Sequence, residues 1–71
     1  MLKIKNNVDL KELEKFGFKD DIGFLQKDMN YITYYINKDI RAIEMWIFEN
    51  EEVVLDNTLY DLIKAGLVEK V

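Results

Sequence analysis

The 71-residue chain has no cysteine, no histidine and no serine. Nucleophilic catalysis and zinc binding usually depend on a thiolate, an imidazole or an activated hydroxyl group. The missing residue types exclude an ordinary zinc site, a thiolate nucleophile and a Ser-His-Asp or Cys-His pair. The missing thiols also exclude a disulfide, so a domain of this size depends on its hydrophobic core for stability.

Glycine clusters and long apolar runs are missing as well. The three glycines are far apart, whereas phosphate-binding loops need several glycines within a short span. We therefore predict no nucleotide, no other cofactor and no small-molecule site. The longest apolar run, Met-Trp-Ile-Phe at 45–48, is far shorter than a membrane span, and the first residues lack the apolar stretch of a secretory signal. We expect a cytoplasmic protein without membrane association.

Positive charge is outnumbered and dispersed. Ten Lys and Arg stand against fourteen Asp and Glu, a net charge of −4, so the average surface repels a phosphate backbone. Carboxylates are the only abundant acid–base groups, notably Asp20, Asp21 and the acids of residues 49–56. Catalysis needs two of them to converge in a pocket, and the spacing matches no calcium loop. We predict a non-enzyme with no catalytic and no metal-binding residues, with a carboxylate or metal-dependent hydrolase as a rival.

Apolar and aromatic side chains are plentiful. Hydrophobic residues make up 49% of the chain and aromatic residues 13%, which is enough for one compact core. No linker, low-complexity tract or shift in composition divides the sequence. We therefore predict a single domain over residues 1–71.

Two segments are typical of short capped helices. Asp9 and Thr58 each stand at the start of an apolar stripe with helical spacing, and a glycine follows each stripe. These signals predict helices at about 9–16 and 58–65. The two helices share the pattern Leu-x-acid-Leu-x-Lys-x-Gly-apolar, which is either a pseudo-repeat or a common consequence of capping and burial.

The apolar period changes from 3.6 to 2 between these helices. Enrichment in β-branched and aromatic residues predicts a hairpin at about 30–48 that turns at 37–39. One or two further short strands are expected, with candidates at 2–5, 22–25, 53–55 and 67–71. The predicted fold class is α+β, a small antiparallel sheet with both helices packed mainly on one face. The strand order and the pairing of the chain ends stay open.

The hairpin is apolar on both faces. One alternating set of residues, from Ile32 to Ile47, forms the face on which we expect the helices to pack. The other alternating set is rich in aromatic residues. A sheet whose second side meets water normally shows polar residues there. We therefore expect this second side to be covered, either by another molecule or within the chain, by residues 19–28 or by one of the helices. A second side that is simply exposed is the remaining alternative.

These features predict a non-enzymatic accessory or interaction protein. Its candidate interaction surface consists of Tyr31, Tyr35, Trp46 and Phe48. Trp and Tyr are enriched at protein interfaces because they bury a large apolar area. The partner is either a second copy of the chain, which gives a homodimer, or another protein.

Two resemblances point elsewhere. Residues 59–71, Leu-Tyr-Asp-Leu-Ile-Lys-Ala-Gly-Leu-Val-Glu-Lys-Val, resemble the end of a winged-helix domain and imply a nucleic-acid-binding regulator, although Lys64 is the only basic residue of that helix. An acidic mimic of DNA is a further alternative, for which −4 is a small charge.

Residues 2–18 and 57–70 resemble short uncharacterised proteins of phages and prophages of low-GC Gram-positive bacteria, which implies an origin but no activity.

Overall fold

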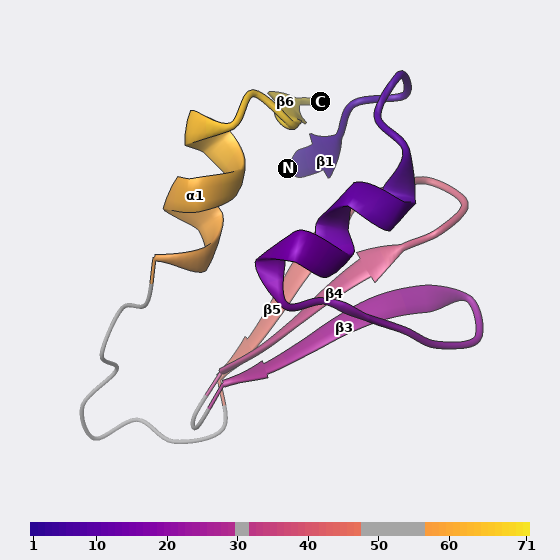
Figure 1. Ribbon diagram of the computed structural model, residues 1–71, viewed down its shortest axis with the longest axis vertical. Helices are drawn as coiled ribbons and strands as arrows, with labels where there is room; N and C mark the ends of the chain where they lie inside the picture. Colours follow the sequence, from indigo (N-terminus) through magenta and orange to yellow (C-terminus); the bar gives the residue numbers. More distant parts are fainter. Residues whose placement is uncertain (30–31, 48–56) are drawn as a thin grey trace.

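The computed structural model describes residues 1–29, 32–47 and 57–71 (Figure 1). The elements in chain order are β1 (Leu2–Ile4), the 3-10 helix η1 (Leu10–Phe16), β2 (Lys19–Asp20), β3 (Phe24–Met29), β4 (Ile32–Asn37), β5 (Ile43–Ile47), α1 (Thr58–Lys64) and β6 (Val68–Lys70). Strands predominate, so α+β fits loosely: the fold has two antiparallel sheets and few helices. The strand expected at 53–55 lies outside the described residues.

The larger sheet has the strand order β2-β3-β4-β5 and is antiparallel throughout. Strands β4 and β5 form the predicted hairpin, with Ile36 opposite Ile43 and Ile32 opposite Ile47. Residues 19–28 supply β2 and the first part of β3. The alternative that this segment covers the second side of the sheet is therefore wrong, because its backbone pairs within the sheet; the short strand expected at 22–25 is found instead as part of β3.

The hairpin turn is longer than predicted, since β5 begins only at Ile43. The side-chain Oδ1 of Asn37 accepts hydrogen bonds from two backbone N–H groups of the turn, at 2.8 and 3.1 Å. Arg41 adopts a left-handed conformation with φ +62°, and its guanidinium donates to the carbonyl oxygens of Lys5 and Val8 at 2.8 and 2.6 Å. These bonds hold the turn against the N-terminal segment.

The two chain ends pair with each other. Strands β1 and β6 are antiparallel, with Leu2 opposite Lys70 and Ile4 opposite Val68, and the two termini lie close together in Figure 1. A backbone hydrogen bond of 2.9 Å from Ile4 to the carbonyl of Arg41 connects this small sheet to the hairpin turn. The short strands expected at both ends are thus confirmed, and their pairing is with each other.

The first predicted helix is a 3-10 helix rather than an α-helix. Its capping is as expected, because Oδ1 of Asp9 accepts the N–H of Lys11 at 3.0 Å. Gly17, at φ +93°, ends the helix, and the N–H of Phe18 donates to the carbonyl of Leu13. Short connecting helices often take this tighter form.

Helix α1 begins and ends near the predicted residues, but its cap differs. Asn57 precedes the helix and makes no side-chain capping bond. Thr58 is the first helical residue, and its Oγ1 accepts a 3.0 Å hydrogen bond from Nζ of Lys27 on β3. Gly66, at φ +76°, turns the chain so that the N–H of Leu67 reaches the carbonyl of Leu62. The prediction that Gly66 ends the helix is therefore confirmed, and the prediction that Thr58 is its N-terminal cap is wrong.

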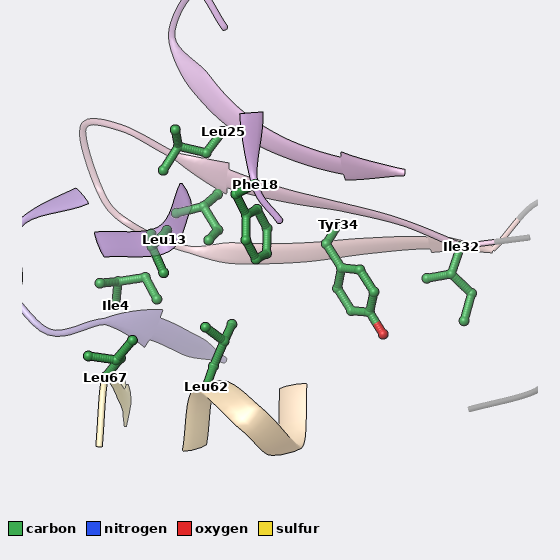
Figure 2. Packing of buried hydrophobic residues seen from close by; sticks show 9 residues of the cluster. Ile4, Leu13, Phe18, Leu25, Ile32, Tyr34, Leu62 and Leu67 are labelled. Carbon is green, nitrogen blue, oxygen red and sulfur yellow. The ribbon is translucent and has the colours of Figure 1, made fainter. Parts of the chain in front are cut away.

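The hydrophobic core lies between these helices and one face of the larger sheet, which we call the core face; β4 contributes Ile32, Tyr34 and Ile36 to it. Figure 2 shows Leu13 of η1 and Leu62 of α1 in this cluster. Both helices thus pack on the same face, as predicted. The whole cluster is Ile4, Leu13, Phe18, Leu25, Ile32, Tyr34, Ile36, Leu62 and Leu67. Within the ranges described, no helix is long and apolar enough to cross a membrane.

Candidate interaction surface

The opposite side of the larger sheet, which we call the second face, combines aromatic and polar side chains. Its members follow from strand alternation and register: Lys19, Phe24, Gln26, Asp28, Thr33, Tyr35, Asn37, Glu44 and Trp46. The buried side chains of η1 and α1 belong to the core on the other side. Among residues 1–29, 32–47 and 57–71, no helix or strand packs over the second face.

Three aromatic residues run diagonally across the second face, one from each of three neighbouring strands. Tyr35 on β4 lies opposite Glu44 of β5, and Trp46 follows Glu44 by two residues on the same strand. On β3, Phe24 lies two residues before the residue that is opposite Tyr35. The rings of Phe24 and Tyr35 meet edge to face, with centroids 5.3 Å apart and planes at 72°. This edge-to-face geometry is favourable for aromatic pairs. We call Phe24, Tyr35 and Trp46 the aromatic diagonal.

The aromatic diagonal lines a hollow of about 430 Å³. The remaining lining residues are Gly23, Asn37 and Glu44. Among the described residues that line the hollow, Glu44 is the only charged one, and Trp46 is 56% exposed. A volume of this size falls within the range of ligand pockets. The hollow therefore offers apolar walls with one carboxylate to an incoming group.

A polar network lies on the second face beside Trp46, because Thr33 pairs with Trp46 on one side and with Asp28 on the other. The Thr33 hydroxyl donates to Oδ1 of Asp28 at 2.6 Å, and the Gln26 amide donates to Oδ2 at 3.0 Å. The bond from Thr33, followed by the bond from Gln26 and the charge of Lys19, lowers the pKa of the Asp28 carboxyl below its ordinary value. Because Asp28 stays ionised, it is poorly suited to donate a proton in catalysis.

A second hollow of about 420 Å³ lies beside Gly17 and contains three aspartates. Each aspartate already has a partner in the chain. Asp20 forms an ion pair with Lys38, Asp21 accepts the N–H of Ile22 at 2.7 Å, and Asp28 belongs to the network above. No group of three or more Asp and Glu residues suited to a metal ion occurs in the described part of the chain.

The structure brings together only part of the predicted surface. Tyr35 and Trp46 line the same hollow, whereas Tyr31 and Phe48 lie outside the described residues. Phe24 was not among the predicted surface residues, because the sequence left open whether residues 22–25 form a short strand or a covering segment. The alternation of apolar and polar residues along β3 could have placed Phe24 on the second face. The charged Lys27, which lies on the core side, interrupts this alternation.

The sequence and the fold were compared with those of known proteins. No protein-family model, no curated protein and no solved structure matches the chain. The function of the second face is therefore inferred from its own residues.

Proposed function

We propose that this chain is a non-catalytic protein that binds another protein through its second face. The hollow along the aromatic diagonal carries this proposal, because the exposed Trp46 and the half-buried Tyr35 that line it are of the residue types that dominate binding energy at interfaces. Water contact with such a surface is unfavourable, and a partner that fills the hollow removes it.

Charge favours a basic partner over a second copy of the chain. The chain has a net charge of −4, so two copies repel one another at long range. A two-fold dimer through the second face also places the same patch on both sides of the interface. Glu44 would then approach the identical carboxylate of the other copy. A segment rich in Lys or Arg meets the same surface with attraction instead.

Peptide-library selection against the folded chain tests this proposal. We expect enriched peptides that shift the backbone amide signals of Phe24, Tyr35, Glu44 and Trp46 in NMR spectra. The Trp46→Thr variant should lose the peptides, since threonine keeps strand propensity but removes the indole ring. The matched control is Tyr60→Thr, because Tyr60 is an aromatic residue of α1 that is 61% exposed and lies outside the hollow; it should keep them.

Two outcomes contradict the proposal. One is peptide binding that Trp46→Thr leaves unchanged, or that shifts amides of η1 and α1 instead. The other is a dimer in equilibrium sedimentation that Trp46→Lys dissociates, because a second copy then occupies the face. We expect the wild-type chain to sediment as a monomer at high micromolar concentration.

A further inference from the structure

Resting on the proposed function, we infer that the hollow on the second face binds the guanidinium group of an arginine in the partner segment. Three aromatic rings and one carboxylate line this hollow. A cation above an aromatic face is attracted by the negative face of the ring. A planar guanidinium also stacks on aromatic rings and donates two parallel hydrogen bonds to a carboxylate.

Glu44 is placed to receive such a cation. It is exposed, it lies opposite Tyr35 and it is two residues from Trp46 on the same face of β5. The ion pairs of the described chain join Lys3 with Glu69 and Lys38 with Asp20, so they leave Glu44 without a cation there. The carboxylate therefore keeps its negative charge available beside the aromatic diagonal.

Arginine suits this lining better than lysine. An ammonium group is strongly hydrated and needs several acceptors to replace its water, whereas a guanidinium is weakly hydrated and stacks. The hollow supplies few acceptors. The Oδ1 of Asn37 already accepts from the N–H groups of Asp39 and Ile40, which leaves the Glu44 carboxylate as the main acceptor side chain.

The arginine belongs to a different protein. Arg41 is the only arginine of the chain, and its Nη1 already donates to the carbonyl oxygens of Lys5 and Val8. Withdrawing it would break the contact that holds the hairpin turn against the N-terminal segment. A second copy of this chain therefore offers no arginine to the hollow.

Titration with amino-acid amides tests this inference directly. Trp46 is the only tryptophan, so its fluorescence reports on the hollow. We expect saturable binding of N-acetylarginine amide at millimolar concentration and weaker binding of N-acetyllysine amide. N-acetylcitrulline amide, which has nearly the same shape without the charge, should not saturate. NMR amide shifts at Phe24, Tyr35 and Glu44 should locate the bound arginine amide.

Matched variants separate local contact from net charge. Glu44→Gln should weaken arginine-amide binding roughly fivefold, as expected for loss of an exposed charge-assisted contact. Glu14→Gln removes the same charge from the exposed side of η1 and should leave the affinity unchanged. Tyr35→Phe should also retain binding, because the ring face remains.

The inference is overturned if citrulline amide binds as well as arginine amide, or if Glu44→Gln and Glu14→Gln behave alike. In that case selected peptides that still contact the second face leave the proposed function standing with a different ligand group. The proposed function itself fails on different results: a dimer that depends on Trp46, or selected peptides that do not contact the second face.

Discussion

The two faces of the larger sheet differ in composition and in coverage: the core face is largely apolar, whereas the second face combines three aromatic residues with polar side chains. On the core face, Ile36 is fully buried beneath Leu13 and Leu62 from the two helices. On the second face, Trp46 is more than half exposed. Met45 and Ile47 of β5 lie on the core face and are nevertheless 44% and 45% exposed. Hydrophobicity alone therefore does not decide burial within this sheet, because an apolar side chain is buried only where the helices cover it.

The charged residues of the two faces also have different surroundings. Lys27 points to the core side of β3 and is half-buried there, where its ammonium donates to Thr58. Long lysine side chains tolerate such a position because the methylene stem packs while the charged end finds a polar partner. Glu44, on the second face, remains exposed. The faces therefore differ in what their polar groups contact as well as in coverage.

The largest effect should come from removing a core contact. Leu62→Ala deletes a side chain with no exposed surface and should lower the free energy of unfolding by about 2–5 kcal/mol. The matched change on the second face, Trp46→Thr, should cost less than about 1 kcal/mol. Urea denaturation followed by circular dichroism measures both. Equal losses for the two variants would mean that something also packs over the second face.

A smaller effect is expected at the end of α1. Gly66 has φ +76°, and no atom of the described chain lies within 4 Å of a Cβ placed there. The cost of Gly66→Ala is therefore backbone strain alone, about 1–2 kcal/mol. Gly66→Asn should cost less, since asparagine tolerates the left-handed region. Denaturation curves in which alanine and asparagine are equally destabilising would contradict this explanation.

The smallest effect should appear in the polar network of the second face. Thr33→Val removes the stronger of the two side-chain donors to Asp28 and should raise the pKa of that carboxyl toward its ordinary value. A depressed pKa in the folded state contributes stability above the ordinary aspartate pKa, and this contribution disappears as pH falls through the folded value. The acid-induced loss of stability should therefore be less steep in Thr33→Val.

Carbon-13 NMR titration of the Asp28 carboxyl checks this prediction. Gln26→Met removes the weaker donor and serves as the comparison, with a smaller rise of the pKa expected. An unchanged Asp28 pKa in Thr33→Val would show that the hydroxyl does not stabilise the carboxylate in solution.

The local features of this protein follow from short stretches of its sequence. The Asp9 cap and the stops at Gly17 and Gly66 were predicted correctly because each depends on bonds between residues that are close along the chain. The hairpin between β4 and β5 was also predictable, since strand alternation places each side chain on a definite face. These features need no knowledge of the rest of the molecule.

The features that join distant segments depend on how the whole chain packs. The pairing of β1 with β6 connects the two chain ends, and the bond from Lys27 to Thr58 spans 31 residues and joins β3 to the first residue of α1. Phe24 reaches Tyr35 and Trp46 only because β3 pairs beside β4. Periodicity says which residues share a face of one strand, but the contacts between strands and helices arise from chain folding over long separations. For that reason the sequence indicated an aromatic face, whereas the packing of both helices on the opposite side was decided by chain folding.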